Sequence, residues 1–210
     1  MRKLITLITI FVTAAVTAQN LQLHRDFERG HFTTTFEYFK MDKYGNTFTF
    51  IDFDYNSAIG TSAAYYEIAR VLKTEKMPVG LHVEYNAGNS NQFSYNEAWI
   101  FGANYSKGNA KWGFSTYAGY KAFTGANKGN FQITGTWYVH LIENKLTFSG
   151  FADLWSENGL SEKTVFLSEP QLWYHLNKSF SIGSEIELTN NFAYEFEFNV
   201  RPTLAIKWNI

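Results

Sequence analysis

Large apolar and polar side chains alternate with a period of two along almost the whole chain after residue 19. In 131–141, Phe131, Ile133 and Trp137 fall on one face of an extended segment. Gln132 and Thr134 fall on the other. Successive side chains of a β-strand point to opposite faces, so this pattern predicts strands, and helical periodicity is nearly absent. The sequence therefore predicts an all-β chain whose sheet separates two environments.

Turn residues divide this pattern into twelve predicted strands. They lie at 20–28, 31–40, 46–56, 62–73, 79–87, 96–106, 111–123, 130–141, 145–155, 163–176, 179–189 and 195–209. Short predicted connections alternate with longer ones rich in Asn, Gly and Ser. The short ones are 73–77, 107–110, 142–144 and 177–178, and the longer ones are 88–95, 124–129, 156–162 and 190–194. Short turns on one rim and long loops on the other are typical of an outer-membrane barrel.

Two architectures can use such a pattern: a soluble sandwich or lipocalin-like barrel with its apolar face inside, and a transmembrane barrel with that face toward lipid. Hydrophobic residues make up 45% of the chain, yet the mean hydropathy is only −0.25 because polar residues are interleaved throughout. Charged and amide groups occupy the polar face of nearly every strand. Aromatic residues near strand ends suit an interfacial girdle; they are Tyr85, Tyr105, Trp112, Phe123 and Trp208. We therefore predict a closed transmembrane antiparallel up-and-down β-barrel of about twelve strands, surrounded by outer-membrane lipid.

Two prolines fall inside predicted strands. Pro170 and Pro202 each lack the amide donor of a sheet ladder. Proline in a sheet is confined to edges, strand starts and bulges. We predict a bulge at each.

The N-terminus has the pattern of a secretory signal peptide. Arg2 and Lys3 precede an apolar run at 4–12, and small residues follow up to Ala18. The run is shorter than the roughly 20 residues that a membrane-spanning helix needs. We predict a signal peptide at 1–18, cleaved after Ala18, and an outer-membrane barrel at 19–210 in a Gram-negative cell.

Composition excludes several classes of function. The formal net charge is −1, so no overall basic field suggests nucleic acid. The chain has no cysteine, which removes thiol catalysis and cysteine-ligated zinc. We expect no cofactor, and the sequence leaves the oligomeric state open.

If the apolar face meets lipid, the polar face lines a lumen. Side chains fill the interior of a barrel of about eight strands, whereas a barrel of about sixteen strands leaves an aqueous channel. A barrel of twelve strands lies between these sizes, so we expect a narrow or partly occluded pore. The predicted pore-lining and solute-binding residues are Asp52, Asp54, Phe48, Phe50, Glu84, Lys111, Lys121, Gln132, Asp153, Trp155, Glu169, Gln171, Trp173, Glu185, Glu187, Glu197 and Arg201. Carboxylates outnumber cations on this face, so the lumen should disfavour anionic solutes.

Aromatic rings share the polar face with these carboxylates, as Phe48 and Phe50 do with Asp52. Rings can stack on a planar base while carboxylates and amides bind hydroxyls. The alternative is that the rings pack the interior and plug a small barrel.

The last predicted hairpin concentrates acidic residues. Our register places Glu187 beside Glu197, and facing like charges destabilise a sheet. Arg201, a lysine on a neighbouring strand or a bound divalent ion such as calcium could compensate them. A salt-bridge network is the simpler interpretation.

An enzymatic function has little support in the sequence. Some outer-membrane barrels modify lipids with serine and histidine, and both residue types occur on the polar face. These are His82, His140, His175, Ser115, Ser149 and Ser181. No nucleophile-elbow motif is present, so we predict that the protein is not an enzyme.

Six stretches together carry a family resemblance: LQLHRDFERGHFTTTFEYFKMDKYGNTFTFIDFDYN (21–56), YYEIAR (65–70), LHVEYNAG (81–88), LTFSGFADLW (146–155), FLSEPQLWY (166–174) and IGSEIELTNNF (182–192). The chain resembles a family of small outer-membrane barrels of unassigned function, allied to the nucleoside-specific channel-forming, Tsx-like porins. The resemblance implies a twelve-stranded pore with nucleosides as candidate solutes, and it assigns no binding residues.

The function predicted from the sequence is therefore an outer-membrane channel for passive diffusion of small hydrophilic solutes, with nucleosides as the specific candidate. The alternative is a structural or interaction barrel with an occluded lumen and exposed loops.

Overall fold

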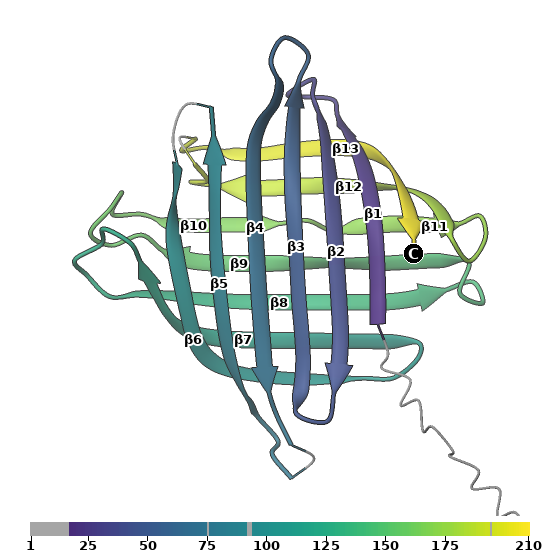
Figure 1. Ribbon diagram of the computed structural model, residues 1–210, viewed down its shortest axis with the longest axis horizontal. Helices are drawn as coiled ribbons and strands as arrows, with labels where there is room; N and C mark the ends of the chain where they lie inside the picture. The colour runs from purple at the N-terminus through teal and green to yellow at the C-terminus, as the bar shows by residue number, and fades with distance from the viewer. Residues whose placement is uncertain (1–16, 75, 92–93, 194) are drawn as a thin grey trace, which may run out of the picture.

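The structure, a computed structural model, describes residues 17–74, 76–91, 94–193 and 195–210. Within these ranges the chain forms thirteen strands in one antiparallel sheet (Figure 1). They are β1 (Thr17–Asp26), β2 (Phe32–Asp42), β3 (Gly45–Asn56), β4 (Gly60–Leu72), β5 (Gly80–Ser90), β6 (Ser94–Gly108), β7 (Trp112–Phe123), β8 (Asn130–Leu141), β9 (Leu146–Ser156), β10 (Thr164–Ser168), β11 (Gln171–His175), β12 (Phe180–Asn190) and β13 (Phe198–Asn209). The predicted signal peptide falls almost entirely outside the described residues, and its cleavage after Ala18 stays a prediction.

The sheet closes on itself because β1 pairs with β13, for example at Leu21 and Trp208. Strands β10 and β11 both lie between β9 and β12, so they are two halves of one position in the barrel. The barrel therefore has twelve positions. This confirms the predicted all-β, closed, antiparallel fold. In Figure 1 the front wall, β1–β5, crosses the rear wall, β7–β13, as tilted strands of a closed barrel do.

The break between β10 and β11 lies at Glu169 and Pro170, as the first proline suggested. Gly150 on the neighbouring β9 has a φ of 152°, and a Cβ there would lie 2.5 Å from the Glu169 carbonyl oxygen. A residue without a side chain is therefore needed where the broken strand approaches β9.

The predicted bulge at Pro202 is wrong. The register of β12 with β13 is the same at Ile182↔Ile206 and at Ile186↔Pro202. The Pro202 carbonyl accepts from the Phe27 amide at 3.5 Å, just past the end of β1. Since the amide and carbonyl of one strand residue point to the same side, Pro202 lacks its donor where β1 has already ended. The proline therefore removes only the reciprocal bond of the pair just beyond the end of β1.

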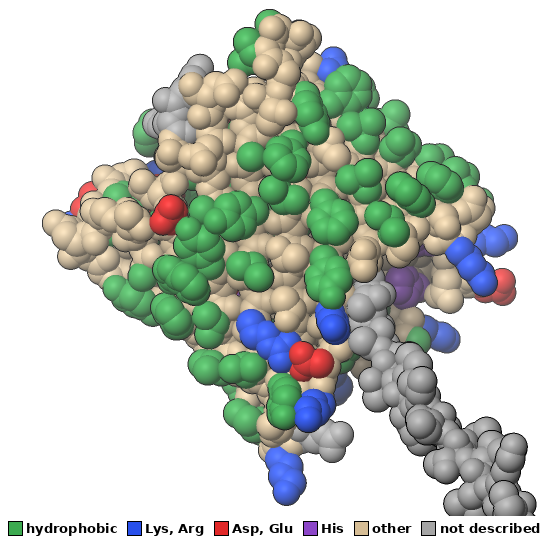
Figure 2. Space-filling model, viewed as in Figure 1, with side chains coloured by type: hydrophobic (Ala, Val, Ile, Leu, Met, Phe, Trp, Pro, Cys, Tyr) green, Lys and Arg blue, Asp and Glu red, His purple; other side chains and the backbone are tan. Residues whose placement is uncertain are grey.

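The exterior of the barrel is apolar. Phe101 on β6, Ile182 on β12 and Phe198 on β13 are 50%, 45% and 60% exposed. In Figure 2 hydrophobic side chains cover a broad diagonal band of the visible face, and most Lys and Arg side chains lie toward its lower and right-hand edges. An apolar band between polar ends is typical of a barrel in lipid. No helix among the described residues is long and apolar enough to cross a membrane.

The two ends of the barrel differ in the connections that they hold. The loop end holds the connections β1–β2, β3–β4, β5–β6, β7–β8, β9–β10 and β12–β13. The turn end holds the connections β2–β3, β4–β5, β6–β7, β8–β9 and β11–β12 and Asn209, near the chain's C-terminus. Three predicted connections were wrong in extent. In the predicted loop 88–95, β5 continues to Ser90 and β6 begins at Ser94. The predicted tight turn at 73–77 widens until β5 begins at Gly80, and the predicted loop 190–194 extends until β13 begins at Phe198.

Candidate functional site

The interior wall carries the polar set of each strand. Glu84 and Gln132 are each 2% exposed, although they lie on different strands of the barrel. Cross-strand partners share a face, so the registers place the other predicted residues with them, except Lys111, Glu169 and Glu197, which lie outside the strands. Asp52, for example, pairs with Tyr65, and Gln132 pairs with Trp155. A role of these residues in solute passage stays a prediction.

An ion-pair network lies at the loop end of the barrel. Arg201 on β13 donates to Glu187 at 2.8 Å and to Glu195 at 2.5 Å. Arg29, from the β1–β2 connection, donates to Glu187 at 3.0 Å and to Asp26 at 2.6 Å. Burial opposes the charged guanidinium of Arg29, but the carboxylates of Glu187 and Asp26 raise its pKa above the ordinary value. These ionic pairs therefore tie the first connection to the last hairpin.

This network corrects the predicted register of the last hairpin. Glu187 pairs with Arg201, not with Glu197, because β13 begins at Phe198 rather than at residue 195. The observed partner of Glu187 lies four residues after the predicted one. Because four is an even number, each side chain keeps its predicted face, but the partner of Glu187 changes from a like to an opposite charge. The compensating group is Arg201, which is one of the possibilities raised by the sequence. Glu197 itself lies outside the strands and is exposed.

A second network fills the middle of the barrel against β5–β9. Lys121 donates to Gln132 at 2.6 Å, and Gln132 donates to the Tyr117 hydroxyl at 2.8 Å. The His82 ring stacks on Tyr117 with centroids 3.7 Å apart, and its Nε2 lies 3.0 Å from Glu84. All five side chains are at most 9% exposed. This half of the lumen is packed rather than open.

The opposite wall, on β2–β4, is more accessible and acidic. Asp52 and Asp54 accept from Thr35 and Thr33 at 2.5 and 2.6 Å, and both carboxylates remain half-buried. Asp52 lies close enough to Glu169 and Glu185 to interact electrostatically across the lumen. Carboxylates from facing walls therefore meet over the less crowded part of the interior, where they attract cations and repel anions.

Trp173 and its neighbours connect the acidic wall to the turn end. The Trp173 indole donates to Gln171 at 2.8 Å, and Gln171 donates to Glu185 at 2.6 Å. The Lys207 ammonium lies 3.9 Å from the Trp173 ring centroid. Trp173 is 1% exposed, so it packs the interior and presents no free face to a solute.

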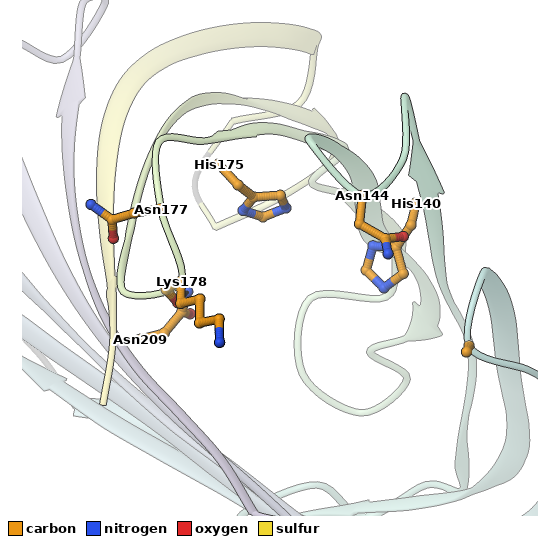
Figure 3. Close-up of a pocket in the computed structure, with 7 residues that line it drawn as sticks. His140, Asn144, His175, Asn177, Lys178 and Asn209 are labelled. Atoms are coloured by element: carbon orange, nitrogen blue, oxygen red, sulfur yellow. Dashed lines mark hydrogen bonds between the residues drawn. The ribbon is translucent and has the colours of Figure 1, made fainter.

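The turn end opens into a cavity of about 580 Å³. His140 and His175 line it, and Figure 3 shows both rings projecting into the space between the turns. Thr147 Oγ1 lies 2.8 Å from His140 Nδ1 and 2.7 Å from His175 Nε2. The hydroxyl holds both rings in place at this mouth. At the loop end a smaller cavity of about 210 Å³ is lined by Arg29, Tyr95 and Arg201, among others.

The structure contains one serine–histidine contact that bears on the enzymatic alternative. His175 Nδ1 lies 2.8 Å from Ser181 Oγ. The other nitrogen of His175 contacts the Thr147 hydroxyl instead of a carboxylate, and Ser181 is 1% exposed. A lipid could not reach this hydroxyl, so the contact is structural. Among the described residues no group of three or more His, Asp or Glu side chains is placed to hold a metal ion.

Sequence reasoning misplaced some residues and missed others. Lys111 lies in the β6–β7 turn and is exposed, so it does not line the strand wall. Glu37, Glu67 and Tyr65 do lie on the interior wall, as their pairing with Phe50 and Asp52 shows. The alternation of 33–39 could have revealed Glu37. The adjacent aromatics Tyr65 and Tyr66 obscured the parity of β4.

Comparisons with known proteins agree with this architecture. A family model described as "Domain of unknown function (DUF5020)" matches residues 18–210. No curated protein matches the chain. Among solved structures, the NanC porin is 10% identical with a TM-score of 0.63, covering 92% of this chain and 100% of that chain. The KdgM porin is 8% identical with a TM-score of 0.56, covering 93% and 99%. A KdgM porin in complex with disordered oligogalacturonate is also 8% identical, covers 93% and 99%, and has a TM-score of 0.54. At these identities the likeness shows the fold.

Proposed function

Since the chain belongs to the family described as a domain of unknown function (DUF5020) and shares the fold of porins, we propose that it is an outer-membrane channel for passive diffusion of small hydrophilic solutes. One observation carries the proposal. The barrel is apolar outside, while half-buried carboxylates such as Asp52 and Glu185 face one another across its interior. A polar interior inside an apolar exterior provides a route for solutes that lipid excludes.

The negative charge of the interior suggests that this barrel prefers other solutes than the KdgM porin, a structural neighbour, does. KdgM porin has been solved with oligogalacturonate, whose sugars carry carboxylates. Here the accessible wall carries Glu37, Asp52, Asp54 and Glu67. Like charges repel, so neutral or cationic solutes should pass in preference to acidic ones. Among neutral solutes we propose nucleosides, because rings and carboxylates occur together on this wall.

Solute flux tests the channel directly. Purified protein folded into liposomes should admit a nucleoside such as uridine, measured by osmotic swelling, whereas liposomes without protein should not swell. Asp52→Ala and Trp155→Ala should change uridine entry more than the entry of an inert sugar of similar size. Asp52 faces the lumen, and Trp155 supports Lys121, whose ammonium lies 4.6 Å from its ring centroid. Glu162→Ala, which removes an exposed carboxylate from the 157–163 connection, should leave both rates unchanged.

Equal effects on uridine and the sugar would leave a general pore without nucleoside preference. Absence of any flux would contradict the channel and favour the second candidate, a structural barrel that presents its loops. The packing of the interior favours that candidate, since Glu84 and Gln132 in the packed half are each 2% exposed and Trp173 on β11 is 1% exposed.

A further inference from the structure

Four aromatic rings form a continuous track, with three on the accessible wall and the fourth, Tyr95, on β6. The ring centroids of Phe48 and Phe50 on β3 lie 6.0 Å apart, and those of Phe50 and Tyr65 on β4 also lie 6.0 Å apart. Tyr65 is followed at 6.1 Å by Tyr95 on β6, which lines the loop-end cavity. All four rings are half-buried. The track therefore runs from Phe48, on the turn-end half of β3, to the cavity at the loop end.

Carboxylates flank the track on both sides. In one cross-strand row Glu37, Phe50 and Glu67 are direct neighbours. In the next row Asp52 pairs with Tyr65, whose hydroxyl donates to Glu67 at 2.7 Å. Each central ring thus has a carboxylate within one strand spacing, so a group that rests on a ring also meets negative charge.

The facing wall adds an unsatisfied acceptor. Asp153 on β9 interacts electrostatically with Tyr65 and Glu67 across the lumen. Its Oδ1 atom is buried and has no hydrogen-bond partner among the described residues. Buried carboxylate oxygens are normally paired, so this unpaired oxygen can accept a hydrogen bond from a donor outside the chain.

The interior already combines cations with rings elsewhere. The Lys207 ammonium lies 3.9 Å from the Trp173 centroid, and Lys121 lies 4.6 Å from that of Trp155. Within the described chain, these lysines cover rings other than Phe48, Phe50 and Tyr65. The central part of the track has the same rings and neighbouring carboxylates, so it offers the same kind of environment to a cation from outside the chain.

We infer that the track is a binding site for small organic cations that carry an ammonium or quaternary ammonium group. A ring face attracts such a cation through its quadrupole, and the flanking carboxylates supply the opposite charge. The inference rests on the proposed function, because the cation must enter the lumen. The proposed function allows neutral or cationic solutes, and this inference makes organic cations the preferred class.

Choline and its neutral carbon isostere, 3,3-dimethyl-1-butanol, test the inference in planar bilayers containing the full barrel. In KCl, choline should reduce the single-channel current at lower concentration than the isostere. Phe50→Leu removes the ring but keeps an apolar side chain. It should weaken block by choline about threefold to tenfold. The matched control Phe101→Leu, on the exterior, should leave the block unchanged.

The outcomes separate this inference from the channel itself. Potassium current with equal block by choline and the isostere, or with block insensitive to Phe50→Leu, would overturn the track as a cation site. Absence of potassium current would contradict the channel, and calorimetric titration of choline into the micelle-folded barrel would then decide the site. Choline binding weakened by Phe50→Leu supports it, and no binding refutes it.

Discussion

Phe101→Arg should destabilise the barrel folded in phospholipid vesicles by about 2–4 kcal/mol, because arginine at the bilayer midplane must be removed from water. Phe101 is the central residue of β6, and its side chain is 50% exposed on the apolar exterior. Its cross-strand neighbours Val83 and Tyr120 are uncharged. Urea-induced unfolding from vesicles, followed by tryptophan fluorescence, measures the change in the free energy of unfolding.

The control for this prediction is Ile59→Arg. Ile59 is 61% exposed but lies in the β3–β4 connection at the loop end, where the side chain meets water. This variant should shift the free energy of unfolding by less than about 0.5 kcal/mol. If both variants have the same small effect, the exterior of the barrel does not face lipid and the channel proposal loses its basis.

Arg201→Met should cost up to about 3–5 kcal/mol of unfolding free energy, because it removes the shorter of the two guanidinium contacts of the buried Glu187 carboxylate. Arg201 is 8% exposed and Glu187 is 7% exposed. Arg29 also donates to Glu187, but it is also paired with Asp26, and its side chain is more exposed than that of Arg201. Equilibrium unfolding in urea, under the same vesicle conditions, measures the loss.

Two further variants show whether the charge causes that loss. The double variant Arg201→Met with Glu187→Met removes both charges, so it should be more stable than Arg201→Met alone. Arg70→Met breaks a more exposed pair with Asp42, whose side chains are 28% and 39% exposed, and should cost about 0–1 kcal/mol. A double variant less stable than the single one would mean that packing, not the unpaired charge, dominates.

The resemblance and the periodicity contributed different parts of the prediction. The match to a family of unassigned function is confirmed by the family model over 18–210. The alliance with nucleoside channels stays a prediction, as does the pore-lining role of the interior residues. Nothing in the sequence placed Tyr65 or Tyr95 in a track, because the neighbouring pair Tyr65 and Tyr66 looks alike on both faces.

The sequence alone determined which side chains face outward and which face inward along most strands, because strand side chains alternate strictly and one face must be apolar. Glu187 and Arg201 were both assigned to the interior on that basis. Only the tertiary structure decided that these two side chains meet each other. Any even shift of a hairpin preserves its faces but changes every cross-strand partner, so the partner depends on where β13 begins. Likewise, the meeting of Asp52 with Glu185 across the lumen follows from barrel closure, which brings together strands that periodicity treats separately.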